Sequence, residues 1–309
     1  MLIHINDPLD KQATQTLSKL LPGHTIISQH LETADLIAKM PEIDVLVIRS
    51  ATKATKEIID AGTHLKLIAR AGMGLDNVDQ NAAKARNIKV INTPGANSLS
   101  VAELVAGMIL SIDRFLVRST TGMIEGKWEK KSLEGFELSG KTLGIVGFGN
   151  IGKLLSKILS GFNLKVMVYD VFEISQETLK EYNAKQVSLE EIYSNCDIIS
   201  FHVPKTEKTT HMVSDKEFEM MKKGVIIVNA SRGGIIDEPA LLRALESGKV
   251  FGAGLDVYEE EPPKSEVYQK LFKMPNVILT PHIGAATVEA QWRVGMDIVD
   301  RIVKEVKNF

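Results

Sequence analysis

Three glycines, at positions 147, 149 and 152, form the most informative group in this 309-residue chain. The run from Lys141 to Val146 has the apolar character of a short buried strand and leads directly into Gly147-x-Gly149-x-x-Gly152. Glycines at this spacing, between a strand and a helix, are typical of dinucleotide-binding sites. In such sites the phosphates lie at the positive end of the helix dipole, against unpaired backbone N–H groups.

The residues that follow these glycines support the same interpretation. A helix is predicted directly after the turn, from apolar residues at helical spacing: Ile151, Leu154, Leu155, Ile158 and Leu159. The next strand, 165–169, ends at Asp170, whose carboxylate can accept hydrogen bonds from adenosine ribose hydroxyls and would repel a 2′-phosphate. Val171 and Phe172 offer no cation to such a phosphate, so the sequence predicts NAD rather than NADP. A simpler role for Asp170, as a turn former at the strand end, remains open.

Three further residues have side chains suited to hydride transfer, and each is expected to follow a buried strand. These are Arg232, Glu261 and His282. Carboxyl ends of parallel strands line the ligand crevice of open α/β sheets, so the three can meet there. His282 can exchange the hydroxyl proton as hydride leaves the same carbon, and Glu261 would raise the histidine pKa and fix its tautomer. Arg232 can bind a substrate carboxylate and polarise the reacting oxygen.

Each of these residues also has a simpler explanation. A histidine after proline can cap a strand, the acidic run 259–261 can be a solvated loop, and Arg232 can bind a cofactor phosphate instead. Their joint occurrence downstream of a dinucleotide motif favours the catalytic interpretation. The histidines given no functional role are His4, His24, His30, His64 and His211.

Composition narrows the class of protein. A length of 309 residues predicts two domains, and a net charge of −2 argues against a nucleic-acid-binding surface. The single cysteine, Cys196, allows neither an intramolecular disulfide nor a cysteine-rich metal site, and no metal-binding motif is present, so we expect no metal. The N-terminus lacks a signal-peptide pattern, and no apolar run is long enough for a bilayer. We expect a cytoplasmic enzyme without nucleic-acid or membrane partners.

Strands and helices alternate along both halves of the chain, which predicts two units with parallel sheets covered by helices. Besides the strands around the glycines, strands are predicted at 2–5, 44–48, 66–69, 89–91, 196–201, 225–229, 250–256 and 277–280. Helices are predicted at 9–21, 31–40, 55–61, 78–86, 188–194, 214–222, 237–247 and 285–309. The segment 92–98 separates the units, and Ser98 or Ser100 is expected to cap the apolar helix that begins at Val101.

Glycines of the first unit indicate the nature of the substrate. Gly72 and Gly74 follow a predicted strand, and backbone N–H groups in such a turn can bind an anion. Arg49 and Arg70, each directly after a predicted strand of the same unit, are expected nearby. The sequence therefore predicts a strongly anionic small substrate.

Together these residues resemble the D-isomer-specific 2-hydroxyacid dehydrogenase family over almost the whole chain. The blocks that carry the resemblance are 47–53, 69–79, 97–104, 126–131, 229–237 and 281–286. The resemblance implies two doubly wound α/β domains, a Rossmann NAD-binding domain at 96–283 and a flavodoxin-like substrate domain at 1–95 plus 284–309. The C-terminal helix would thus return to the first domain.

Residue roles are also implied by the resemblance. Arg232, Glu261 and His282 match the family's catalytic triad in order and spacing. The implied contacts to NAD are Gly147, Gly149, Asn150, Ile151, Gly152, Asp170, His202, Val203, Pro204, Ala230, Ser231, Arg232, Asp256 and His282. The implied contacts to the substrate are Arg49, Ser50, Arg70, Gly72, Asn97 and Lys130. A homodimer through the NAD-binding domain is implied as well, with the loop 120–140 at the interface and Lys130 reaching the neighbouring subunit's site.

The implied activity is oxidation of 3-phospho-D-glycerate to 3-phosphohydroxypyruvate in serine biosynthesis, with His282 as the acid–base group. Arg49 and Arg70 favour this phosphorylated substrate. Reduction of hydroxypyruvate or glyoxylate, or turnover of another D-2-hydroxy acid, is the alternative within the family. A non-catalytic NAD-sensing protein is the alternative outside the enzymes. Many relatives add a C-terminal serine-binding domain; this sequence ends at Phe309, so serine feedback by that route is not expected.

Overall fold

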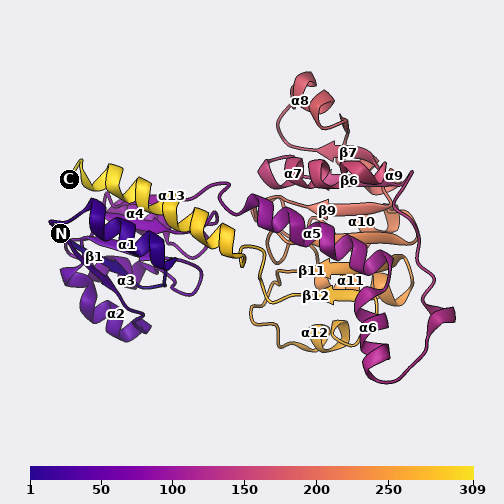
Figure 1. Cartoon of the computed structure of the whole chain (residues 1–309), viewed down its shortest axis with the longest axis horizontal. Coiled ribbons are helices and arrows are strands. Elements are labelled where there is room, and N and C mark those ends of the chain that lie inside the picture. The colour runs from indigo at the N-terminus through magenta and orange to yellow at the C-terminus, as the bar shows by residue number, and fades with distance from the viewer. The chain divides into compact units, whose positions relative to one another are not determined.

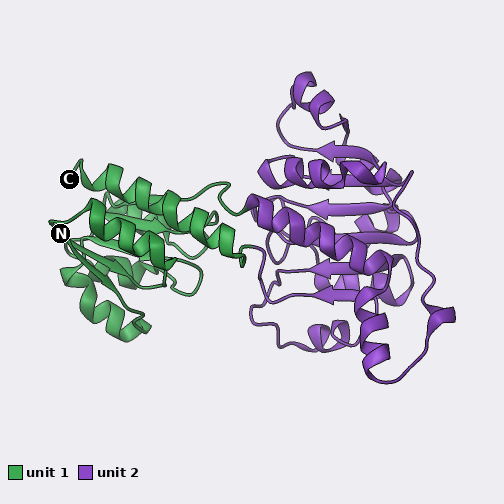
Figure 2. Cartoon of the chain, in the orientation of Figure 1, with its two compact units in different colours: residues 1–97, 285–309 green, residues 98–284 purple.

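The computed structural model describes all 309 residues and contains two compact units (Figure 2). The first unit combines Met1–Asn97 with Ala285–Phe309, and the second is Ser98–Gly284. The divisions fall after residues 97 and 284. None of the helices combines the length and the apolar character needed to cross a membrane.

The first unit is built on a five-stranded parallel sheet of order β2-β1-β3-β4-β5, the strand order of flavodoxin-like folds (Figure 1). Its elements are β1 Leu2–Ile5, α1 Lys11–Leu20, β2 Thr25–Ser28, α2 Thr33–Lys39, η1 Met40–Glu42, β3 Val45–Ile48, α3 Lys56–Ala61, β4 Leu67–Arg70, α4 Gln80–Ala85, β5 Lys89–Asn92 and α13 Val288–Val306. Strand β2 was not predicted, because an edge strand with exposed ends has too short an apolar run to be distinguished from a loop.

The C-terminal helix α13 belongs to this first unit, although it follows the second in sequence. Thr287 caps it by accepting a hydrogen bond from the Ala290 amide. Its buried face packs with α1 in one apolar cluster, and Gly295 lies so close to Ala13 that a side chain there would collide with it. The amphipathic pattern of this helix is therefore explained by packing within one unit.

The second unit contains a seven-stranded parallel sheet of order β12-β11-β10-β9-β6-β7-β8 (Figure 1). Its strand order reverses between β6 and β9, as in Rossmann folds. The elements are α5 Ser98–Asp113, α6 Leu116–Ile124, η2 Lys130–Ser132, β6 Thr142–Val146, α7 Asn150–Ile158, η3 Leu159–Phe162, β7 Lys165–Tyr169, α8 Gln176–Glu181, β8 Ala184–Gln186, α9 Leu189–Asn195, β9 Ile198–Phe201, α10 Asp215–Met220, β10 Val225–Asn229, α11 Glu238–Glu246, β11 Val250–Leu255, α12 Glu266–Leu271 and β12 Val277–Leu279.

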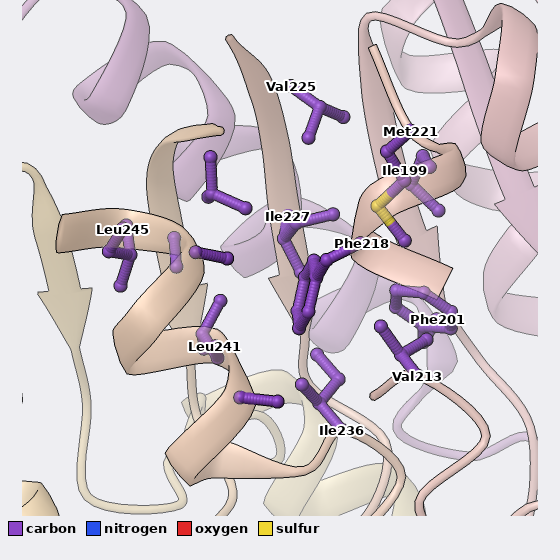
Figure 3. Packing of buried hydrophobic residues seen from close by; sticks show 14 of the residues in the cluster. Ile199, Phe201, Val213, Phe218, Met221, Val225, Ile227, Ile236, Leu241 and Leu245 are labelled. Carbon is purple, nitrogen blue, oxygen red and sulfur yellow. The ribbon is translucent and has the colours of Figure 1, made fainter. Parts of the chain in front are cut away.

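Apolar side chains on both faces of this sheet make it a buried central layer. Successive residues of β10 alternate between two clusters: Val225 and Ile227 join one, Ile226 and Val228 the other. On the first face, Ile227 shares an apolar cluster with Phe218 of α10 and Leu241 of α11 (Figure 3). On the second face, α5 and α7 contribute the covering side chains. A continuous apolar strand of this kind is what a doubly covered parallel sheet requires.

Every strand predicted from the sequence is present, with ends that differ by no more than two residues. The predicted cap of the long helix is wrong. Helix α5 already begins at Ser98, whose hydroxyl is buried without a hydrogen-bond partner, and the Ser100 hydroxyl donates to the Gly284 carbonyl at 2.6 Å. Helices α6, α8 and α12 and strand β8 were missed, because each is short and buries few side chains.

Candidate functional site

The polar residues expected to do chemistry follow the carboxyl ends of four strands of the second unit. The glycine turn follows β6, Arg232 follows β10, Glu261 follows β11 and His282 follows β12. All these strands run parallel, so their carboxyl ends share one edge of the sheet. This edge is where open α/β sheets bind ligands.

Local hydrogen bonds build the Arg232 turn. The Asn229 carboxamide oxygen accepts from the Ser231 amide at 3.0 Å and from its hydroxyl at 2.7 Å. The Asn229 carboxamide nitrogen donates to the Arg232 carbonyl at 2.9 Å. A Cβ at Gly233 would lie only 1.7 Å from the Tyr258 carbonyl oxygen. The Arg232 turn therefore packs backbone to backbone against the loop that carries Glu261.

Glu261 and His282 form a direct ion pair. The distance between Glu261 Oε2 and His282 Nδ1 is 2.8 Å, and the side chains are 38% and 49% exposed. With Nδ1 engaged by the carboxylate, Nε2 is the ring nitrogen left to exchange a proton with a substrate. The backbone of His282 has φ +52°, an uncommon value for a residue with a side chain, so the surrounding loop must impose it.

The charges of all three residues act on one another. The hydrogen bond and charge of Glu261 raise the pKa of His282, against the opposing effects of burial and of Arg232. Burial acts to raise the pKa of Glu261, but hydrogen bonds from His282 and the Tyr258 amide, with the charge of Arg232, lower it overall. The sequence predicted that a guanidinium, a carboxylate and an imidazole would converge, and the structure brings them together.

Asp256 directly follows β11, at the edge of the sheet that carries the other predicted cofactor residues. Only 1% of the residue is exposed. Its carboxylate accepts from the Thr280 hydroxyl at 2.6 Å and from the amides of Ile283 and Gly284, each at 2.8 Å. It thus anchors the chain on both sides of His282. The Asp256 carboxylate therefore holds the histidine loop in place, and its predicted contact to the cofactor stays a prediction.

The glycine turn has the shape that a dinucleotide requires. Gly147 has φ +95°, and a Cβ there would lie 2.6 Å from the His202 carbonyl oxygen, so only glycine fits. Gly149 has open space where a Cβ would be, directly before the N-terminus of α7. A Cβ at Gly152 would lie 2.5 Å from the Gly147 carbonyl oxygen. The open side of the turn leaves room for phosphates at the helix N-terminus, while its other side is closed by packing.

Asp170 supports the glycine turn from the end of β7. Its carboxylate accepts from the Phe148 amide at 2.8 Å and from the Phe172 amide at 3.1 Å, and the residue is half-buried. A carboxylate has about four acceptor positions, so it can still accept from ribose hydroxyls. No arginine or lysine stands at Val171 or Phe172, both of which are exposed. The charge at this end of the turn therefore suits NAD.

The other predicted cofactor residues lie on the same edge of the sheet. His202 follows β9, and its Nε2 lies 2.9 Å from the Ser200 hydroxyl. Burial lowers the pKa of His202 to about 4, so the ring is neutral near pH 7. Val203 and Pro204 follow it, Ala230 and Ser231 follow β10, and Asn150 and Ile151 begin α7. These residues thus follow the carboxyl ends of β6, β9 and β10, which are neighbours in the sheet.

The predicted substrate residues of the first unit also gather at strand ends. Arg70 ends β4 and pairs in register with Ile48, the last residue of β3, so Arg49 follows on the neighbouring strand. The Arg70 guanidinium lies against the Gly72 backbone, since a Cβ there would be 1.6 Å from Nη1. The buried carboxylate of Asp7 accepts from the Arg49 amide at 2.6 Å and so holds the loop that continues into Ser50.

Two predicted substrate residues lie elsewhere. Asn97 ends the first part of the first unit, and its buried side-chain oxygen has no hydrogen-bond partner. Lys130 belongs to η2 of the second unit, beside a hollow of about 300 Å³ lined by Met123 and Trp128. Lys130 is exposed, and its predicted contact to the neighbouring subunit's site stays a prediction.

Comparison with known proteins places these features in context. Residues 106–284 match the family model described as D-isomer specific 2-hydroxyacid dehydrogenase, NAD binding domain. The chain is 51% identical over 304 residues to the hydroxypyruvate reductase of Thermotoga maritima, with 98% of each chain covered. It is 46% identical over 280 residues to human D-3-phosphoglycerate dehydrogenase, which covers 91% of this chain but only 52% of that protein.

A solved structure shows the same architecture. The D-lactate dehydrogenase of Aquifex aeolicus, complexed with NAD and lactic acid, has a TM-score of 0.88 at 28% identity. The similarity covers 100% of this chain and 96% of that one.

Proposed function

Since the chain belongs to the D-isomer specific 2-hydroxyacid dehydrogenase family and is an NAD-dependent oxidoreductase, we propose that it oxidises 3-phospho-D-glycerate to 3-phosphohydroxypyruvate. The observation that carries this substrate is the pair of arginines, Arg49 and Arg70, at adjacent strand ends. A phosphorylated tail brings negative charge that both guanidiniums can bind, which an uncharged tail does not. The reaction would start the phosphorylated route to serine in the cytoplasm.

The groups at the strand ends would divide the work as follows. Bound NAD supplies the hydride acceptor for C2 of the hydroxy acid. His282 Nε2 takes the proton of the C2 hydroxyl, and Glu261 stabilises the resulting imidazolium through Nδ1. Arg232 binds the substrate carboxylate and orients C2. In the reverse direction the protonated His282 returns its proton to the keto oxygen.

Steady-state kinetics tests the substrate. We expect kcat/KM for 3-phosphoglycerate to exceed that for glycerate and lactate, and Arg49→Gln to lower it roughly tenfold to a hundredfold, since one charge-assisted hydrogen bond is lost. Lys66→Gln is the matched control, because Lys66 precedes β4 at the opposite end of the strand from Arg70. A preference for an unphosphorylated acid, unaffected by Arg49→Gln, would exclude the proposed substrate.

Reduction of hydroxypyruvate is the second candidate. The observation in its favour is that the Thermotoga maritima hydroxypyruvate reductase matches almost end to end, whereas the human phosphoglycerate dehydrogenase extends well beyond the match. The two candidates share the triad and the cofactor and differ in the charge of the substrate tail. The same kinetic comparison, extended to hydroxypyruvate and glyoxylate, distinguishes them.

The pH dependence follows from the Glu261–His282 pair. Reduction of a keto acid needs protonated His282, so kcat/KM should be full at low pH and decline as pH rises through the raised pKa of His282. Oxidation of the hydroxy acid needs the neutral ring of His282, so its kcat/KM should rise as pH rises through the same pKa. Glu261→Gln removes the charge that raises this pKa, so both midpoints should move to lower pH. Profiles between pH 5 and 10 measure the shift, and unchanged midpoints would contradict the pairing.

Cofactor choice depends on Asp170. We expect Asp170→Asn to lower the ratio of the affinity for NAD to the affinity for NADP by roughly tenfold or more, because the charge that repels a 2′-phosphate is removed. The Phe148 and Phe172 amides donate to different oxygens of Asp170, so the single asparagine oxygen can keep only one of these two hydrogen bonds. Titration of NADH and NADPH by fluorescence measures the ratio, with Glu173→Gln, an exposed acid three positions on, as the control. Equal selectivity in wild type and Asp170→Asn would contradict this role.

A homodimer through the second unit is proposed from an exposed apolar patch on α6 and the turn after it. The patch comprises Leu116, Val117, Met123, Ile124 and Trp128, of which Ile124 is 82% and Trp128 77% exposed. Apolar side chains so grouped on a surface mark interaction sites. We expect Ile124→Glu to convert a dimer into a monomer in light scattering after size exclusion, while Val288→Glu, equally exposed on α13, leaves the mass unchanged. A monomeric wild type would exclude the dimer.

A further inference from the structure

We propose that Glu238 and Tyr268 act as a pair of positioning residues that hold Glu261 against His282. This inference rests on the acid–base role proposed above for His282. Glu238 is the first residue of α11 and Tyr268 lies in α12, so the two come from different helices. Neither is one of the predicted site residues, and both lie behind the loop that ends at Glu261.

Three successive backbone amides of this loop are held by side chains. The Tyr258 amide donates to Glu261 Oε1 at 3.1 Å, the Glu259 amide to Glu238 Oε1 at 3.0 Å, and the Glu260 amide to the Tyr268 hydroxyl at 3.1 Å. The charge of the nearby Glu238 carboxylate acts on the Tyr268 hydroxyl. These two side chains therefore determine where two consecutive peptide groups of the loop lie.

The burial of Glu238 and Tyr268 indicates that Glu238 does more than begin helix α11. Glu238 is 4% and Tyr268 3% exposed. An acid in the first turn of a helix interacts favourably with the helix dipole while still exposed to water, so the dipole does not account for burying the carboxylate. The Glu238 carboxylate accepts a hydrogen bond from the Glu259 amide. The buried carboxylate of Glu238 therefore fixes the segment that carries Glu261.

Other contacts place the same loop but do not replace this pair. Glu259 Oε2 meets His211 Nε2 at 2.9 Å, with both side chains more than 40% exposed, so water screens this contact. The Tyr258 ring packs edge-on against Tyr268 with centroids 5.8 Å apart. Loss of the Tyr268 hydroxyl would keep this ring packing and remove only its hydrogen bond to the Glu260 amide. Tyr268→Phe is therefore a specific test of the polar link.

The direct readout is the titration of His282 in the protein without substrate. Histidine-labelled protein followed by NMR gives the pKa of each ring, and the signal missing in His282→Ala identifies the one of interest. We expect Tyr268→Phe to lower the pKa of His282 by roughly half a unit or more, because Glu261 is less closely held. kcat/KM should fall about tenfold or more, while the Kd for NADH stays within about twofold.

Tyr193→Phe is the matched control. Tyr193 is also 3% exposed, and its hydroxyl donates to the Met212 carbonyl at 3.2 Å, outside the Glu261 loop. This variant should lose stability without changing the titration of His282. Glu238→Gln is the second variant, in case Tyr268→Phe does not fold. It keeps an acceptor for the Glu259 amide, so it should shift the pKa of His282 in the same direction by less.

The outcomes separate this inference from the proposed function. A pKa of His282 equal to that of wild type in Tyr268→Phe and Glu238→Gln overturns the positioning role, whatever the turnover. An equal shift in Tyr193→Phe overturns it too, because the effect would then be general loosening. A lowered pKa in Tyr268→Phe alone supports the positioning role; if turnover is then unaffected at every pH, it is the acid–base role of His282 that fails.

Discussion

Replacement of His282 by alanine is expected to lower kcat by about 10²- to 10⁴-fold in both directions, the range measured for loss of a general acid–base group. The proton of the substrate hydroxyl then has no positioned acceptor, while the glycine turn and Asp170 remain intact. Binding of NADH should therefore persist, because His282 is only one of the proposed contacts and those around α7 and β7 are unchanged. Steady-state turnover and a fluorescence titration with NADH measure the two effects separately.

His64→Ala is the control for this experiment. His64 is an exposed residue in a loop of the first unit and has no role in the proposed reaction. Its variant should retain wild-type turnover and NADH affinity. If His282→Ala keeps more than about a tenth of wild-type kcat, His282 is not the acid–base group. If NADH binding is lost together with turnover, the histidine loop supports the cofactor and the loss of rate is not specific.

Gly233→Ala is expected to have the second large effect, because the methyl group has no space. Its Cβ would lie 1.7 Å from the carbonyl oxygen and 2.0 Å from the carbonyl carbon of Tyr258, both backbone atoms. Because these are backbone atoms, a change of side-chain conformation cannot relieve the clash, and the Arg232 turn and the Glu261 loop must move apart. We expect a loss of about 1–3 kcal/mol in the free energy of unfolding, and a fall of about 10²-fold in kcat/KM.

Gly107→Ala is the matched control for the same chemical change. Gly107 lies inside α5, and a methyl group added there would meet no atom of a neighbouring element within 4 Å. Alanine is favoured over glycine in a helix interior, so this variant should gain up to about 1 kcal/mol and keep its activity. Denaturant unfolding and steady-state kinetics measure both variants. A Gly233→Ala protein as active as Gly107→Ala would show that the two backbone segments need not be in contact.

The architecture was accessible from the sequence because its signals are local. Runs such as 225–229 are apolar at nearly every position, as a strand covered on both faces requires, and the glycines of the α7 turn identify the dinucleotide site through backbone geometry alone. Arg232, Glu261 and His282 each follow such a strand, so parallel topology was enough to expect them at one edge of the sheet. Strand β8 shows the limit, because its three residues include no buried side chain.

By itself, therefore, the sequence determined the class of fold, the NAD-binding motif and which residues can do the chemistry, since those depend on residue type and short spacing. Only the tertiary structure decided which polar groups support the site. Asp256 was predicted as a cofactor contact without its bonds to the histidine loop, and Glu238 and Tyr268 were not noticed at all; in the structure all three hold the loops of His282 and Glu261. Their roles depend on hydrogen bonds between segments far apart in the chain, and the direction of a buried carboxylate leaves no periodic pattern in the sequence.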